Sequence, residues 1–192
     1  MYRRVLLKLS GEALMGNQSY GLAANMVHQV ATDLIAVAHS GVEIAVVVGG
    51  GNFFRGIKGE AIGLDRTTSD HIGMLATTMN ALALRSAIAL QGHHAVVLSA
   101  VDMDTFCEKF TLRRAGDLLS QKSILIFAAG TGNPYFTTDT AAVLRAIELS
   151  CDLLLKGTKV DGLYDSDPLK NPEAKKLDVI HYDDVIEKDL RL

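Results

Sequence analysis

Two lysines stand in apolar runs, where their charge needs a partner. Lys8 lies within VLLKLSG (5–11), and Lys156 lies within CDLLLKG (151–157). An ammonium group in a buried strand is costly unless it meets an anion, although a lysine at a strand edge can instead extend to water. Two lysines at the ends of two strands could converge on one transferring phosphoryl group. That reaction suits them, because its catalysis is mostly positioning and neutralisation of oxygen charge.

Two aspartates and an arginine extend this set of charged residues. Asp139 and Asp70 each stand at the start of a predicted helix, where a carboxylate can serve simply as a cap or first-turn acid. In the functional alternative, Asp139 orients the two lysines and Asp70 accepts hydrogen bonds from a ribose. Arg55 follows a glycine triplet and Asn52, where it can either reach a phosphate or remain solvated.

The elements that must position these residues are short apolar runs, most of which end in glycine. They are VLLKLSG (5–11), EIAVVVGGG (43–51), SILIFAAG (123–130), CDLLLKG (151–157) and, without a final glycine, HAVVLSA (94–100). Such runs, without polar alternation, are typical of parallel strands covered on both faces. Helical patterns lie between or after them, over 25–39, 70–90, 107–120, 138–149 and 183–190. The alternation predicts an α/β fold with a mainly parallel sheet.

Apolar spacing within two of these helices also predicts a buried face. The expected stripes are Ile72, Leu75, Met79 and Leu82 in the first, and Ala141, Leu144 and Ile147 in the second. The segment Met74–Met79 is accordingly expected in the core. The preceding stretch, FFRGIKGEAIGLDRTTSD (53–70), lacks periodicity and is interpreted as a long loop of the kind that forms lids or binding loops.

The glycine breaks are candidates for holding anions. In open parallel sheets, ligands bind beyond the carboxyl ends of the strands, where backbone N–H groups and helix N-termini can point at them. The GxxxxGK[ST] loop does not occur, and the GxGxxG pattern fails at Phe54 and at Tyr135. A Rossmann dehydrogenase is therefore disfavoured. Two separate glycine loops indicate two phosphate groups, one of a donor and one of an acceptor.

Composition narrows the class of protein. The chain has 192 residues, 48% of them hydrophobic and 21% charged, and its net charge is −3. These are ordinary globular values, and without a basic stripe no nucleic-acid partner is expected. The apolar stretch in the N-terminal MYRRVLLKLSGEAL is too short for a signal peptide or a membrane span. A cytoplasmic protein without a membrane partner is the resulting expectation.

Five blocks of the sequence, taken in order, resemble the bacterial uridylate (UMP) kinases of the amino acid kinase superfamily. They are KLSGEAL (8–14), VVVGGGNFFRG (46–56), DHIGMLATTMNALALR (70–85), GTGNPYFTTDTAA (130–142) and LLKGTKVDGLYDSDP (154–168). The resemblance implies a three-layer αβα sandwich with a mainly parallel central sheet, formed as a single domain over 1–192. It also implies the reaction ATP + UMP ⇌ ADP + UDP, with Mg²⁺, in pyrimidine nucleotide biosynthesis.

The resemblance also assigns roles to individual residues. The ATP contacts would be Lys8, Leu9, Ser10, Gly11, Gly51, Arg55, Thr158, Tyr164 and Asp167. The UMP contacts would be Gly50, Asp70, Thr131, Gly132, Asn133, Pro134, Tyr135, Phe136, Thr137 and Thr138. Lys8, Lys156 and Asp139 are the expected catalytic residues. No protein ligand to a metal is assigned, so Mg²⁺ is expected to arrive with ATP.

The chain departs from the family pattern in two places, one in a segment expected to bind effectors and one at its C-terminal end. Family members are typically homohexamers that GTP activates and UTP inhibits, but the segment SAIALQGHHAVV (86–97) lacks several basic residues expected of an effector site. Family chains also continue past the block VIEKDLRL with a Met-Asp-containing helix and further elements, so the C-terminal part of the fold is expected to be absent here. Two alternatives to a UMP kinase stay open. The chain could be another kinase of the superfamily, acting on a carboxylate or carbamate, or a non-catalytic nucleotide-binding protein on the same fold.

Overall fold

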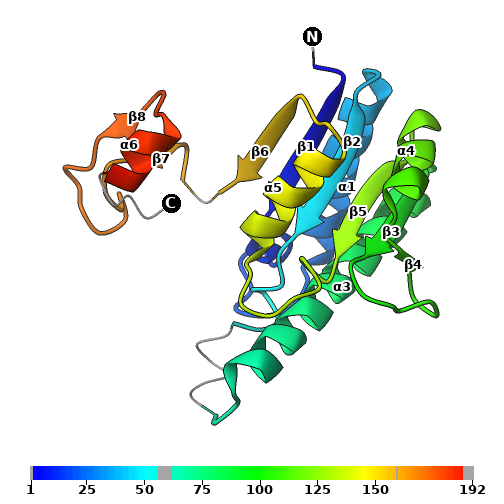
Figure 1. Ribbon diagram of the computed structural model, residues 1–192, viewed down its shortest axis with the longest axis horizontal. Helices are drawn as coiled ribbons and strands as arrows, with labels where there is room; N and C mark the ends of the chain where they lie inside the picture. The colour runs from blue at the N-terminus through cyan, green and yellow to red at the C-terminus, as the bar shows by residue number, and fades with distance from the viewer. Residues whose placement is uncertain (1, 56–61, 159, 188–192) are drawn as a thin grey trace. The chain divides into compact units, whose positions relative to one another are not determined.

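The computed structural model describes residues 2–55, 62–158 and 160–187, which separate into two compact units (Figure 1). The first unit is Met1–Gly157 and the second is Thr158–Leu192. The predicted loop over 53–70 lies partly outside the described residues. The single domain expected over 1–192 stays a prediction.

A six-stranded sheet forms the centre of the first unit, with the strand order β4-β3-β5-β2-β1-β6. Its strands are β1 Arg4–Leu9, β2 Glu43–Val48, β3 Ala95–Ser99, β4 Glu108–Lys109, β5 Ile124–Ala128 and β6 Leu153–Gly157. Every pairing in it is parallel, which confirms the expected sheet. The two-residue β4 was not predicted, because 107–120 was expected to be helical. In the register of β1 with β6, Lys8 stands directly beside Lys156.

Helices cover both faces of this sheet, as the resemblance implied. They are α1 Ala24–His39, α3 Arg66–Leu90, α4 Leu112–Ser120 and α5 Thr138–Glu148, and a short 3-10 helix, η1 Gly11–Leu14, follows β1. One apolar cluster joins α1 and α3 to the sheet through Ile44, Val46 and Val48, and a second joins α4 and α5 through Ala45 and Val47. Alternate residues of β2 thus face opposite layers, and the αβα sandwich is confirmed.

Helix α3 begins earlier and buries a different face than predicted. It starts at Arg66 rather than 70, because Asp65 caps it by accepting a hydrogen bond from the Thr68 N–H. The predicted core stripe is wrong at Leu75 and Met79, which are 55% and 49% exposed, whereas Leu82 packs against the apolar cluster. The buried residues of this helix instead include several small polar ones; they are Ser69, Ala76, Thr77, Thr78, Asn80, Ala81, Leu84 and Ile88. A helix with apolar residues on most sides does not reveal its buried face by spacing.

Helix α3 is also long and apolar enough to cross a membrane when judged by length and composition. Here it buries Leu84 and Ile88 in the cluster that it shares with the sheet and α1. The core helix of a soluble protein passes the same test, so the signal carries little weight.

Helix α5 likewise turns an unexpected face to the sheet. Of the predicted stripe, Ala141 is buried, but Leu144 is 41% and Ile147 is 72% exposed. Arg145 is instead buried, beside Ala142 and Ala146. The Arg145 guanidinium lies 3.9 Å from the centre of the Phe110 ring and forms an ion pair with Glu148. Small alanines let the helix approach the sheet, and the arginine fills the remaining space with a paired charge.

Replacing Arg145 tests this packing of α5. We expect Arg145→Ala to lower the free energy of unfolding by about 2–4 kcal/mol, because it removes a desolvated cation–π contact and unpairs Glu148. Ile147→Ala is the matched control on the same helix, and we expect it to stay within about 0.5 kcal/mol of the parent protein. Urea unfolding measures both variants. A larger loss for Ile147→Ala would contradict the observed face.

The second unit is small, and none of its described residues, 158 and 160–187, is buried. It contains the antiparallel pair β7 Leu163–Tyr164 and β8 Lys176–Leu177, followed by α6 Tyr182–Glu187. Of the helix predicted over 183–190, the part up to 187 is confirmed, and the remainder lies outside the described residues.

Candidate functional site

Three glycine-containing loops meet beyond the carboxyl ends of β1, β2 and β5. The loop after β1 joins the loop after β2 through a hydrogen bond of 2.9 Å from the Gly49 N–H to the Leu9 carbonyl. Beside them is a cavity of about 140 Å³, which the start of α3 helps to line. Its lining residues are Gly50, Gly51, Phe54, Ser69, Asp70, Gly73, Met74, Thr77, Gly130, Thr131, Phe136 and Thr138. Six of them were predicted to contact nucleotides: Gly50, Gly51, Asp70, Thr131, Phe136 and Thr138. A seventh, Gly130, belongs to the glycine break that was predicted to form the acceptor side.

The structure brings the two lysines together on one carboxylate. Lys8 Nζ lies 3.0 Å from Asp139 Oδ1, and Lys156 Nζ lies 3.4 Å from Asp139 Oδ2. The cap of α5 is Thr137, whose hydroxyl accepts a hydrogen bond from the Thr140 N–H. Asp139 therefore does not cap the helix through its side chain. It stands in the first turn, where it bridges the ends of β1 and β6.

The charge balance of this group leaves a net positive site. Burial raises the pKa of Asp139, but the hydrogen bonds and positive charges of Lys8 and Lys156 outweigh that effect and hold the pKa below its usual value. The carboxylate therefore stays ionised at neutral pH. One carboxylate between two ammonium groups leaves about one positive charge, and such a site can attract a phosphoryl group.

Asp70 joins α3 to the loop that follows β5. Its carboxylate accepts a hydrogen bond of 2.7 Å from the Tyr135 N–H and another of 2.9 Å from Arg66 Nε. Burial raises the pKa of Asp70, but these two donors together hold it below its usual value. Asp70 lies in the second turn of α3, so the expectation that it starts the helix is wrong. Its predicted contact with a ribose stays a prediction.

The loop after β5 has an unusual backbone that α3 holds at both ends. Ala129 and Tyr135 have φ values of 62° and 70°, a left-handed conformation that non-glycine residues rarely adopt. At one end the Ala129 N–H donates to Thr77 Oγ1 over 2.8 Å, and at the other Asp70 holds Tyr135. Within the loop, the Thr131 hydroxyl donates a hydrogen bond to the Asn133 carbonyl and accepts one from the Asn133 N–H. Such conformations persist where the surrounding structure fixes them, often at binding sites.

The glycines of the first two loops differ in what surrounds them. A Cβ on Gly11 would lie 2.5 Å from the Gly49 carbonyl oxygen, and one on Gly50 would lie 2.8 Å from the Gly73 carbonyl oxygen. These two glycines are required by close packing. Gly51 faces open space, with nothing within 4 Å of such a Cβ, so its backbone is accessible to a ligand.

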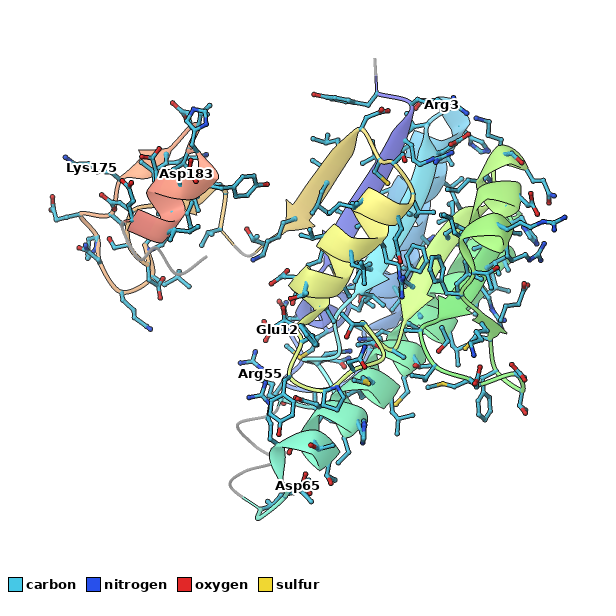
Figure 2. All side chains as sticks on the ribbon, viewed as in Figure 1. Arg3, Glu12, Arg55, Asp65, Lys175 and Asp183 are labelled. Atoms are coloured by element: carbon cyan, nitrogen blue, oxygen red, sulfur yellow. The ribbon has the colours of Figure 1, made fainter. Side chains whose placement is uncertain are left out.

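The remaining predicted residues of the first unit lie around this group. Leu9 belongs to the core cluster, and Ser10 caps η1 by accepting a hydrogen bond from the Glu12 N–H. Arg55 forms an ion pair with Glu12, and the two side chains lie close together in Figure 2. Both residues line a second cavity of about 160 Å³. The Arg55 side chain is therefore paired with a carboxylate, instead of being surrounded only by water.

The three predicted ATP contacts near the C-terminus belong to the second unit. There Thr158 Oγ1 donates to the Val160 carbonyl, and the Tyr164 hydroxyl donates to Asp161 Oδ1 over 2.6 Å. This hydrogen bond raises the pKa of Tyr164. Asp167 accepts a hydrogen bond from the Leu169 N–H within a turn.

Sequence reasoning missed five of the residues that line the first cavity. They are Phe54, Ser69, Gly73, Met74 and Thr77. Ser69, Gly73 and Thr77 recur at a spacing of four residues, which places small and polar groups along one stripe of an otherwise apolar helix. That stripe was the available signal, and starting the predicted helix at 70 hid it. The Ser69 hydroxyl is buried and has no hydrogen-bond partner among the described residues.

Comparison with known proteins places the chain in a family. Residues 3–191 match the amino acid kinase family. The uridylate kinase of Roseobacter denitrificans is 56% identical over 189 residues, which are 98% of this chain and 78% of that protein. The uridylate kinase of Rickettsia prowazekii is 52% identical over 191 residues, which are 100% of this chain and 79% of that protein.

Solved structures agree with the sequence comparison. The crystal structure of UMP kinase from Bacillus anthracis superposes with a TM-score of 0.95 at 35% identity, covering 100% of this chain and 79% of that one. UMP kinase from Ureaplasma parvum gives a TM-score of 0.93 at 33% identity, covering 100% and 81%. The chain therefore belongs to the amino acid kinase family and, within it, to the uridylate kinases.

Proposed function

We propose that this chain transfers the γ-phosphoryl group of ATP to UMP, giving ADP and UDP. The observation that carries the proposal is the bridging of Lys8 and Lys156 by Asp139 at the end of the sheet where the three glycine loops meet. A phosphate oxygen of UMP attacks the γ-phosphorus, and the bond from that phosphorus to the β–γ bridging oxygen breaks. The two ammonium groups neutralise charge on the transferred oxygens.

The acceptor nucleotide would occupy the cavity between α3 and the loop after β5. The cavity brings Asp70 and Gly50 together with Thr131 and Thr138. Backbone N–H groups and hydroxyls at the start of α5 can hold a phosphate, since the N-terminus of a helix favours negative charge. Asp70 is proposed to bind the ribose, in addition to holding Tyr135. The other proposed UMP contacts in this loop are Gly132, Asn133, Pro134, Tyr135, Phe136 and Thr137.

The donor phosphates would contact the loops after β1 and β2, through Ser10, Gly11, Gly51 and Arg55. Leu9, whose side chain lies in the core, can contribute only through its backbone. Arg55 would exchange its ion pair with Glu12 for the phosphates. Thr158, Tyr164 and Asp167 are proposed to hold the ATP nucleoside, on the basis of the family motif alone.

The residues present fit a magnesium ion that arrives with ATP. Within the described residues, no three His, Cys, Asp or Glu side chains come together as a metal site. Mg²⁺ commonly keeps its waters and binds through substrate phosphates and one or two carboxylates. Asp139 would be the protein carboxylate available to it. When bound, the metal adds to the neutralisation of phosphate charge.

Assembly, regulation and location remain proposals from the family pattern. We propose a homo-oligomer, with a hexamer as the expected form, and the exposed Leu75 and Met79 of α3 are apolar surface of the kind that subunits cover. Allosteric control and a cytoplasmic location are proposed on the same basis. Activation by GTP is not part of the proposal, because the segment 86–97 lacks several basic residues expected of an effector site. Size-exclusion chromatography with light scattering tests the assembly.

A coupled assay of ADP release tests the proposed reaction. We expect turnover with UMP as acceptor and none with amino acid carboxylates or carbamate. Phosphorylation of a carboxylate or carbamate without UMP turnover would assign the chain to another branch of the family. Calorimetric binding of ATP and UMP without ADP release would instead indicate a non-catalytic nucleotide-binding protein.

Gly51→Ala separates the contact with ATP from the stability of the fold. Because a Cβ at Gly51 meets nothing within 4 Å, we expect unfolding to change by less than about 0.5 kcal/mol. The new methyl group would keep donor phosphates from the backbone and raise KM for ATP about tenfold, the equivalent of one lost contact of about 1.4 kcal/mol.

Gly11→Ala is the contrasting variant. Its Cβ would crowd the Gly49 carbonyl, so we expect a loss of about 1–3 kcal/mol in unfolding free energy. Steady-state kinetics and thermal unfolding measure both variants. An unchanged KM for ATP in Gly51→Ala would contradict the donor role of that loop.

A further inference from the structure

Two buried asparagines form a reciprocal amide pair between α3 and the glycine triplet. Asn80 Nδ2 donates to Asn52 Oδ1 over 2.7 Å, and Asn52 Nδ2 donates to Asn80 Oδ1 over 3.0 Å. The side chains are almost completely buried. Neither residue lines the proposed UMP cavity, and the family motif gave neither of them a role.

The second N–H group of each amide holds a loop. Asn80 Nδ2 also donates to the Gly49 carbonyl over 2.7 Å, and Asn52 Nδ2 donates to the Gly21 carbonyl over 2.9 Å. All four N–H groups of the pair are therefore used. Amides buried this deeply are costly unless satisfied, and a fully satisfied network fixes a single arrangement of the groups that it joins.

The pair also sets the distance between the first two glycine loops. A Cβ on Gly11 would lie 3.0 Å from Asn80 Nδ2 and closer still to Asn52 Oδ1, so the backbone after β1 rests directly on the two amides. The glycine triplet is held at both of its ends, at Gly49 by Asn80 and after Gly51 by Asn52 itself. The two loops thus share one rigid support on α3.

We propose that Asn80 and Asn52 are positioning residues that align the donor phosphates with the acceptor phosphate. The inference rests on the proposed function, because Gly50 is then the UMP side and Gly51 the ATP side of one short loop. A shift of about 1 Å between reacting groups can cost about 10²-fold in rate even when each partner still binds. The pair therefore acts on kcat more than on either KM.

Asn80→Asp tests the proposal with almost no change in shape. At pH 8 the carboxylate has no N–H to donate to Gly49 or to Asn52, and we expect kcat to fall about 30- to 100-fold, with KM for each nucleotide changed less than about threefold. A buried carboxyl has a raised pKa. Towards pH 6 its protonated form regains one donor, so the deficit in kcat relative to the parent protein should shrink. The groups hydrogen-bonded to the two side chains are themselves neutral amides and backbone carbonyls.

Leu84→Ala is the matched control, because Leu84 is buried on the same helix and belongs to the apolar cluster, with no polar group that could hold the loops by a hydrogen bond. It costs stability through a cavity, and we expect its kcat to remain within about twofold of the parent value, since it leaves the loops in place. Asn52→Asp is a milder second variant, in which Asn80 still donates to both of its acceptors. We expect a loss of about 3- to 10-fold in kcat. Equal kcat values for these Asn variants and Leu84→Ala would overturn the proposal.

Amide hydrogen exchange decides the question independently of turnover. In Asn80→Asp we expect faster exchange over 9–14 and 49–54, and in Leu84→Ala no change there. If the parent protein fails to phosphorylate UMP, the proposed function is lost, and unchanged protection of both segments in Asn80→Asp would still refute the positioning role. Faster exchange confined to these loops would support it.

Discussion

Lys8→Ala is expected to lose about 10³-fold or more in kcat while keeping its fold. The Lys8 ammonium lies 3.0 Å from Asp139 and stands directly beside Lys156 across the sheet. Removing it takes one of two positive charges from the position where oxygen charge develops. Preorganised donors at such positions contribute about 10²- to 10³-fold each, and cationic groups in phosphoryl transfer contribute up to about 10⁵-fold.

Lys109→Ala is the control for Lys8→Ala, because it removes an aspartate-paired lysine on the exposed surface, 2.7 Å from Asp102. We expect wild-type kcat from it. Circular dichroism and thermal unfolding establish that both variants are folded, and the coupled assay gives kcat. A Lys8→Ala variant with near-normal kcat would remove the lysine from the chemistry and leave the neutralising role to Lys156.

The sheet was predictable because parallel strands covered on both faces have a local signature. The run EIAVVV of β2 needs no partner to reveal that both of its faces are buried, since alternate side chains would otherwise be polar. The strand ends followed from the glycines, and the convergence of Lys8 and Lys156 followed from placing two such strands side by side. These features depend on residues close together in the sequence.

The faces of the helices were not predictable in the same way. Arg145 is buried because Phe110 and Phe127 lie over it, and both are distant in the sequence. Leu75 and Met79 are exposed although their spacing favours the core. The spacing of apolar residues does not show which polar or charged side chains have a partner in the fold. It therefore cannot recognise a buried arginine or a buried asparagine.

The site shows the same division. Asp139 was identified by its place after a glycine loop. Its ion pairs with Lys8 and Lys156 could not be predicted in the same way, because they depend on how β1, β6 and α5 are placed relative to one another. Asn80 and Thr77 were missed because their partners, Gly49 and Ala129, are 31 and 52 residues away. Only the three-dimensional arrangement shows that one helix supports all three loops.

Asp139→Asn is the second substitution with a large expected effect, about 10²-fold in kcat at pH 7, similar to the loss of one preorganised charged group. The amide cannot balance two neighbouring ammonium groups, so the lysines repel each other and no longer stand together where the oxygen charge develops. Combining it with Lys8→Ala should cost little more than Lys8→Ala alone, because the residues act as a unit.

The pH dependence of stability gives an independent check on Asp139. Burial raises its pKa, but Lys8 and Lys156 together hold the folded-state pKa below its usual value, whereas the unfolded value is about 3.9. A depressed folded pKa stabilises the protein above the unfolded pKa, and the contribution disappears as pH falls through the folded value. The parent protein should thus be more stable than Asp139→Asn at pH 7, and the difference should shrink below about pH 4. A difference that persisted unchanged at pH 2 would mean that the carboxylate is not bound by the two lysines.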